Sequence, residues 1–161
     1  MSGELHELGA LALAAKIRGR EVSPVELVDY CLARVAAHNG TLSAFVTVTA
    51  EEARAEAKRA ERQLLAAAPE DLPPLFGVPT AIKDLTATAG VRTTFGSQVF
   101  GDFVPEHDAH VVTLLKKAGT ISLGKTNTPE FGLSANTDNE VFGPTRNPWD
   151  IGRTAGGSSG G

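Results

Sequence analysis

The feature that most constrains the fold is an alternation of helical apolar patterns with short, strand-like apolar segments. Leucine, alanine and isoleucine recur at helical spacing from Leu8 to Ile17, and Gly19 then interrupts the pattern. Further along the chain, helical and strand-like segments follow one another. Each element must bury its apolar face against a neighbour, so such alternation favours layers of helices on a sheet. We therefore predict an α/β fold with a helical N-terminal segment.

Two more helices are predicted in the first part of the chain. Residues 23–26, Ser-Pro-Val-Glu, form a capping box with proline at the first helical position, and an apolar stripe then runs to Asn39 and Gly40. The β-branched and aromatic residues at 44–49 predict a short strand. Thr49 is then expected to cap a third helix, which runs through Leu64 or so.

Composition limits the classes of function. The chain has 161 residues, of which 42% are hydrophobic, enough for a packed core. Its formal charge of -4 gives no reason to expect nucleic acid or an anionic membrane as a partner. No secretory signal and no run of 18 apolar residues is found, so a cytoplasmic location is expected. The four histidines are too scattered for a metal site, and we expect no metal and no cofactor: His6, His38, His107 and His110.

The single cysteine, Cys31, lies on the apolar stripe of the second predicted helix. No basic residue stands beside it at helical spacing, so nothing there would stabilise a thiolate. We interpret Cys31 as a small buried hydrophobic residue and not as a nucleophile.

Lys83 is the first residue with a candidate chemical role. Residues 77–84 read Gly-Val-Pro-Thr-Ala-Ile-Lys-Asp, and Ala81 and Ile82 are typical of a buried strand. Apolar neighbours at the end of such a strand would desolvate the amine, lower its pKa and suit it to act as a general base. Taken alone, the segment favours a solvated lysine or a partner for Asp84 over a general base.

Residues 119–126 match the phosphate-loop pattern G-x-x-x-x-G-K-[ST] letter by letter. A phosphate loop follows a strand and opens a helix. Here the first glycine follows a helix predicted from Asp108 to Lys117, and the strand predicted at 120–123 fills the pattern itself. Nucleotide binding therefore remains only an alternative, and we interpret Lys125 as a structural or substrate-cleft residue.

The C-terminal part is the most informative. Residues 156–161 read Gly-Gly-Ser-Ser-Gly-Gly, a loop that can expose amide N–H groups and hydroxyls together. The same six letters are typical of a flexible linker. The turn-rich segment 142–150, Phe-Gly-Pro-Thr-Arg-Asn-Pro-Trp-Asp, favours the loop, because a linker needs no such rigid neighbour.

Four blocks together resemble the amidase signature family in order and approximate spacing: residues 77–84, 124–127, 142–150 and 156–161. The resemblance covers essentially the whole chain. It implies an α/β/α sandwich around a large mixed sheet, of which residues 1–161 would be the N-terminal part of one catalytic domain. Residues 1–68 would form a mainly helical lead-in, and residues 75–161 would begin the catalytic core.

The resemblance also implies a Ser-Ser-Lys triad. Lys83 would be the neutral general base, and Ser158 would be the bridging serine that follows a cis peptide bond. Four neighbours would support the loop: Gly156, Gly157, Ser159 and Gly160. The attacking serine would come from a second glycine-serine segment downstream of Gly161. Three earlier serines lack a glycine-rich turn and are interpreted as ordinary residues: Ser97, Ser122 and Ser134.

By this resemblance the chain belongs to a hydrolase that cleaves linear carboxylic amides through an acyl-enzyme and releases ammonia or an amine. Residues 128–132, Thr-Pro-Glu-Phe-Gly, favour a stand-alone amidase with a small-molecule amide substrate. The glutaminase subunit of the tRNA-dependent amidotransferase is the alternative, and a non-catalytic remnant is another. The resemblance implies no direct contact with nucleic acid and is compatible with a homodimeric full-length enzyme.

We predict that the 161-residue chain by itself has no amidase turnover, because the expected nucleophile lies beyond Gly161. The measurement is ammonia release from simple amides by the purified chain. Release at a rate that Lys83→Ala abolishes would contradict the prediction.

Overall fold

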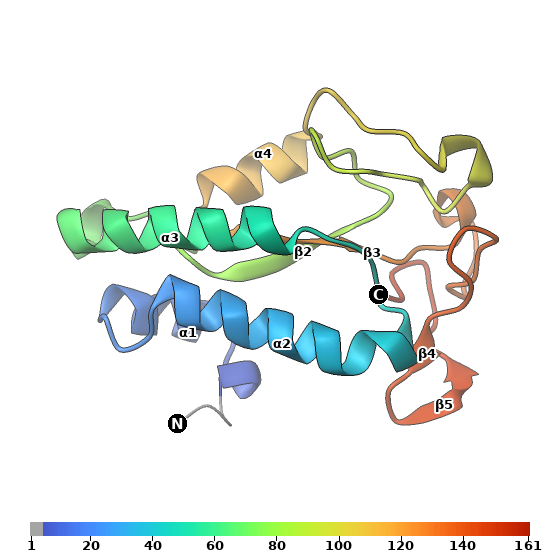
Figure 1. Cartoon of the computed structure of the whole chain (residues 1–161), viewed down its shortest axis with the longest axis horizontal. Helices are drawn as coiled ribbons and strands as arrows, with labels where there is room; N and C mark the ends of the chain where they lie inside the picture. Colours follow the sequence, from blue (N-terminus) through green and yellow to red (C-terminus); the bar gives the residue numbers. More distant parts are fainter. Residues whose placement is uncertain (1–4) are drawn as a thin grey trace. The chain divides into compact units, whose positions relative to one another are not determined.

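The computed structural model describes residues 5–161 and confirms the α/β class. Five short strands and four α-helices are found among these residues. The elements are α1 (Ala10–Arg18), α2 (Pro24–Leu42), β1 (Phe45–Val48), α3 (Ala50–Ala66), β2 (Pro79–Lys83), α4 (His110–Lys117), β3 (Ile121–Thr126), β4 (Arg146–Asn147) and β5 (Asp150–Thr154) (Figure 1). In this described part of the chain, no helix is both long and apolar enough to cross a membrane.

The chain folds into two compact units that interleave along the sequence. Among the described residues, the first unit comprises 5–34, 49–80 and 113–123. The second comprises 35–48, 81–112 and 124–161. The four blocks that resemble the amidase signature family lie in the second unit, apart from residues 77–80.

The first unit is built around apolar side chains from α1, α2, α3 and the segment after α3. Its core residues are Ala14, Ile17, Leu27, Leu64, Leu72, Phe76 and Val78. Part of the helical repeat predicted at 8–17 is seen in this core, since Ala14 and Ile17 are three residues apart and both are fully buried, whereas Leu11 is exposed. Cys31 packs at the edge of this core, and burial raises the pKa of its thiol.

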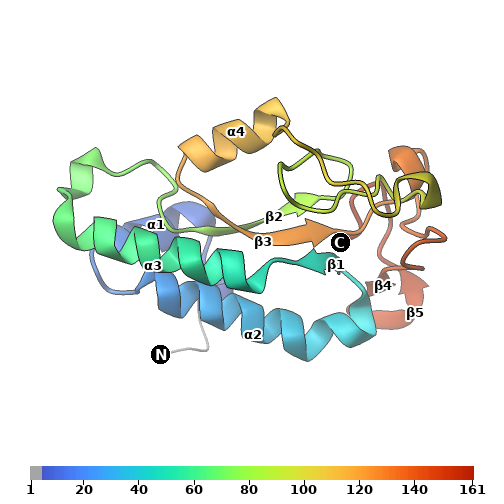
Figure 2. The ribbon, with the colours of Figure 1, turned by 45° about the horizontal axis from the view of Figure 1, so that its top comes forward.

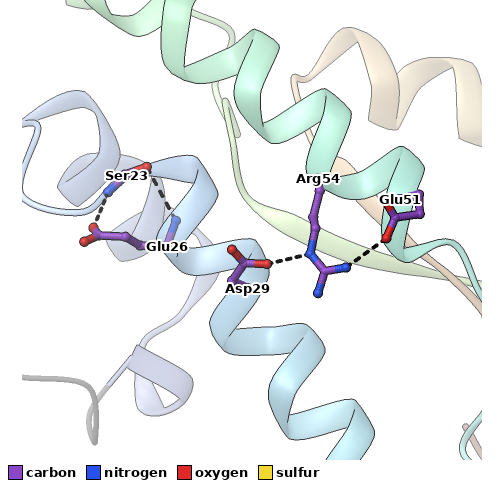
Figure 3. A network of polar contacts seen from close by, with 5 residues as sticks. All are labelled: Ser23, Glu26, Asp29, Glu51 and Arg54. Carbon is purple, nitrogen blue, oxygen red and sulfur yellow. Dashed lines mark hydrogen bonds and ion pairs between the residues drawn. The ribbon is translucent and has the colours of Figure 1, made fainter.

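Helix α2 begins with the predicted capping box. Ser23 Oγ accepts a hydrogen bond from Val25 N at 3.0 Å, and Glu26 Oε2 accepts one from Ser23 N at 3.1 Å. Further along, Asp29 of α2 accepts from Arg54 of α3 at 2.8 Å (Figure 3). These polar contacts fix where α2 starts and tie it to α3, which runs beside it.

In the second unit, the end of β3 pairs antiparallel with β1, through Phe45 opposite Thr126 and Val48 opposite Gly124. Strand β2 lies on the other side of β3, as the sheet order β1-β3-β2 requires (Figure 2). There Asp84 N donates to Thr126 O at 2.9 Å. Lys83, at the end of β2, is therefore held next to the end of β3. A separate antiparallel hairpin is formed by β4 and β5.

Three local expectations need correction. Helix α2 continues through Gly40 to Leu42, because a glycine inside a helix weakens it without stopping it. Thr49 occupies the N-cap position of α3, yet its side chain makes no capping hydrogen bond. Residues 124–126 continue strand β3 and open no helix, which excludes the phosphate-loop interpretation of 119–126.

We predict that Gly124→Ala destabilises the chain by at least about 2 kcal/mol. Gly124 has a φ of +137°, and a Cβ atom there would overlap the carbonyl oxygen of Thr47 on β1. The matched control is Gly40→Ala, where a Cβ meets nothing within 4 Å and helix propensity improves. Urea denaturation of both variants tests this. Equal stability of the two variants would show that β1 and β3 do not approach so closely.

Candidate active site

Lys83 and Ser158 meet in the second unit, as the sequence analysis expected them to do. Lys83 Nζ lies 2.8 Å from Ser158 Oγ, within hydrogen-bonding distance. Ile82, the preceding residue of β2, is buried, and Lys83 itself is partly buried. Desolvation lowers the pKa of the Lys83 amine from that of an ordinary lysine. The pair thus combines hydrogen-bonding distance with an amine of lowered pKa, two conditions that favour proton transfer.

The terminal loop packs closely against its surroundings. The peptide bond between Gly157 and Ser158 is cis, and Gly156 has a φ of +85°. A Cβ on Gly157 would lie 2.8 Å from Ser134 O, and one on Gly160 would overlap the side chain of Thr137. Glycine is required at these positions because the backbone approaches other residues too closely for a side chain.

Thr128 connects the loop to the segment that follows β3. Its hydroxyl donates to Ser158 O at 3.3 Å, and Thr128 itself is fully buried. Ser159, next in the loop, is exposed. The backbone of Ser158 is therefore held at its carbonyl while its side chain faces Lys83.

Two buried asparagines support Thr128, and the sequence analysis missed both. Asn139 Nδ2 donates to Thr128 O at 2.8 Å and to Asn127 Oδ1 at 2.8 Å. Asn127 Nδ2 in turn donates to Thr145 Oγ1 at 3.0 Å. Because a buried amide must be fully paired, these side chains fix the segments at 127, 139 and 145 relative to one another. Asn127 lies inside the recognised block 124–127 but was given no role there, and Asn139 lies between two blocks.

Lys125 is separate from this pair. It is fully buried on β3, and its ammonium donates to Thr88 Oγ1 at 2.9 Å, to Thr93 Oγ1 at 3.0 Å and to the carbonyl oxygen of Thr86. Burial lowers its pKa to about 8, while the carboxylate of Asp84 acts in the opposite direction. Of the two options in the sequence analysis, these contacts favour a structural residue.

The three serines set aside in the sequence analysis occupy ordinary structural positions. Ser97 is buried in the loop before η3, a 3-10 turn at Gln98–Phe100. Ser134 is exposed and accepts from Asn136 N at 3.1 Å. Ser122 lies within β3. Across the described part of the chain, no cluster of histidine, cysteine and carboxylate groups could hold a metal ion.

The model of the Amidase family matches residues 26–161. The chain belongs to the amidase family. A glutamyl-tRNA(Gln) amidotransferase subunit of Prochlorococcus marinus (strain MIT 9303) is 52% identical over 141 residues, which cover 88% of this chain and 29% of that protein. The chain therefore spans about a third of the length of the relatives that it matches.

Solved amidase structures resemble the chain closely. One, described as revealing the origins of an s-triazine catabolic enzyme, has a TM-score of 0.88 and 38% identity, covering 95% of this chain and 33% of that one. Another, a bacterial aryl acylamidase of the amidase signature enzymes, has a TM-score of 0.87 and 31% identity, covering 95% and 32%. The resemblance inferred from the four sequence blocks is confirmed.

We predict that the buried charge of Lys125 makes stability rise with pH above about 8. The pKa of Lys125 is about 8 in the folded chain and 10.5 as a free side chain. Between these pH values, the Lys125 amine is therefore mostly protonated in the unfolded chain and mostly neutral in the folded chain. Between pH 7.5 and pH 10, the free energy of unfolding should therefore rise by roughly 2 kcal/mol more in the wild-type chain than in Lys125→Met. Urea denaturation at pH 7.5 and pH 10 measures the difference. Parallel curves for the two proteins would contradict a lowered pKa.

Proposed function

We propose that this chain supplies the proton relay of an enzyme that hydrolyses the C–N bond of a carboxamide. The observation that carries the proposal is the 2.8 Å contact between Lys83 Nζ and Ser158 Oγ, made by an amine whose pKa burial lowers. A lysine in its neutral form can accept a proton, and a lowered pKa makes that form easier to reach. A serine hydroxyl can accept one proton while it donates another.

In the proposed mechanism, Lys83 accepts the proton of Ser158, and Ser158 accepts the proton of an attacking serine hydroxyl. The attacking oxygen forms a bond to the amide carbon. The proton then returns through Ser158 to the leaving nitrogen as the C–N bond breaks, which leaves an ester between enzyme and acyl group. Water cleaves this ester by the same relay. The attacking serine is expected from a segment that follows Gly161 in proteins of this family.

For the substrate, we propose the side-chain amide of glutamine, with the chain acting as part of the glutamine-hydrolysing subunit of a glutamyl-tRNA(Gln) amidotransferase. The 52% identity to the Prochlorococcus amidotransferase protein supports this choice over the stand-alone amidase that residues 128–132 favoured. It exceeds the 38% and 31% identities to the two solved structures described above.

The stand-alone amidase remains the second candidate, supported by a specific observation. Thr128 and Pro129 open the segment whose sequence resembles that of stand-alone amidases, and Thr128 contacts the carbonyl oxygen of Ser158. A difference in this segment would therefore act next to the relay. Hydrolysis of simple amides by the protein in isolation would favour this candidate.

The test uses the protein expressed from its complete open reading frame. We expect glutamine hydrolysis that rises when the other amidotransferase subunits and charged tRNA are added. Lys83→Ala and Ser158→Ala should each lower the rate by about 10²- to 10⁴-fold, the range for loss of a general acid or base. The controls are Lys117→Ala and Ser134→Ala, which change exposed residues outside the relay and should leave the rate within about threefold.

Two outcomes would contradict the proposal. If Lys83→Ala kept the wild-type rate, Lys83 would not be the general base. If the protein hydrolysed aryl or aliphatic amides but not glutamine, the amidotransferase assignment would be wrong, while the relay would still stand.

A further inference from the structure

Lys125 is fully buried and takes no part in the proposed relay, yet the acceptors of its ammonium all lie in the segment that follows Lys83. We propose that Lys125 is a positioning residue for the Lys83–Ser158 pair: it holds residues 86–93 against strand β3 and so fixes the direction of the Lys83 side chain. The inference rests on the proposed function for the chemical role of Lys83.

The ammonium of Lys125 has three hydrogens and three acceptors. These are the carbonyl oxygen of Thr86 and the hydroxyls of Thr88 and Thr93, the last two at 2.9 Å and 3.0 Å. The hydroxyl of Thr88 also donates to Thr86 O, and that of Thr93 donates to Val91 O. One side chain from β3 thus gathers both arms of a loop that has no regular secondary structure.

This loop begins directly after Lys83. Lys83 O accepts from Thr86 N at 2.9 Å, so the residue that Lys125 holds through its carbonyl group is the one bonded back to Lys83. Among the residues that the structure describes, the Lys83 amine has one hydrogen-bond partner, Ser158. The direction of the Lys83 side chain therefore depends on its backbone, which forms a turn between Lys83 and Thr86.

Asp84 closes the same loop from within. Its carboxylate accepts from both Thr94 N and Thr94 Oγ1, and its own N–H donates to Thr126 O at 2.9 Å. The charges of Asp84 and Asp108 favour the ammonium form of Lys125. The positive charge of Arg92 in turn favours the carboxylate form of Asp84. With a pKa of about 8, Lys125 is mostly protonated at neutral pH and keeps all three donors.

The variant that removes the clamp is Lys125→Met, which keeps most of the side-chain volume and deletes the three donors. A milder variant, Thr88→Val with Thr93→Val, deletes two acceptors and leaves Lys125 in place. The matched control is Lys117→Met, which deletes an exposed ammonium at the end of α4.

Two readouts are combined. The first is competitive acetylation of the 161-residue chain with acetic anhydride over a pH series, read for Lys83 by mass spectrometry. The second is the pair kcat and KM for glutamine, measured on the protein from the complete open reading frame. A loosened loop admits water to the Lys83 amine, which removes part of the desolvation that lowers its pKa.

We expect the Lys83 acetylation midpoint to rise by about 0.5 to 1 pH unit in Lys125→Met, and kcat to fall at least about tenfold with KM within about twofold. The double threonine variant should also raise the midpoint and lower kcat, by smaller amounts. Lys117→Met should change neither the midpoint nor kcat. If Lys125 were purely structural, Lys125→Met would lower the stability of the chain without moving the Lys83 acetylation midpoint of the folded variant.

An unchanged midpoint and unchanged kcat in folded Lys125→Met would overturn the inference. If Lys125→Met does not fold, the same result in the double threonine variant overturns it. Absence of amide hydrolysis by the wild-type protein would refute the proposed function alone, because the Lys83 midpoint is measured without turnover.

Discussion

The hydrogen bond between Lys83 and Ser158 is the contact on which the site depends, and it joins residues 75 positions apart in the sequence. Lys83 is placed by the end of β2, which is bonded to β3 through Asp84 N. Ser158 is placed by Thr128, which follows β3. The positions of both Lys83 and Ser158 thus depend on β3 and the segment that follows it. A change in the course of β3 would separate a serine and a lysine that no local interaction brings together.

Strand β3 can hold both residues in place because its backbone packs tightly against β1. Gly124 has a φ of +137°, and a Cβ atom at this position would overlap the carbonyl oxygen of Thr47. A side chain at this position would push β1 away and shift the two residues that follow. These are Lys125, which clamps the loop after Lys83, and Thr126, which accepts from Asp84. The glycine that imitates a phosphate loop in sequence is therefore required by close packing between strands.

The sequence predicted the elements whose signals are local. The capping box at Ser23 and the apolar repeat to Ile17 both correspond to observed contacts. The candidate site was predictable only by family resemblance, since Lys83 alone favours a solvated lysine and residues 156–161 have the composition of a linker. Asn139 could not be predicted, because a buried asparagine is recognised by partners distant in sequence, such as Asn127 and Thr128 O, and not by neighbours.

The two lysines differ in the number of their hydrogen-bond partners, and this difference matches the two roles proposed for them. Both have pKa values lowered by burial. Lys125 donates to three oxygens and lies near two carboxylates, so loss of its proton would break a contact and leave an acceptor unpaired. Lys83 donates to the hydroxyl of Ser158, which can reverse the hydrogen bond when the amine is neutral. Lys83 can therefore lose its proton without leaving an acceptor unpaired, which supports its proposed role as the proton acceptor.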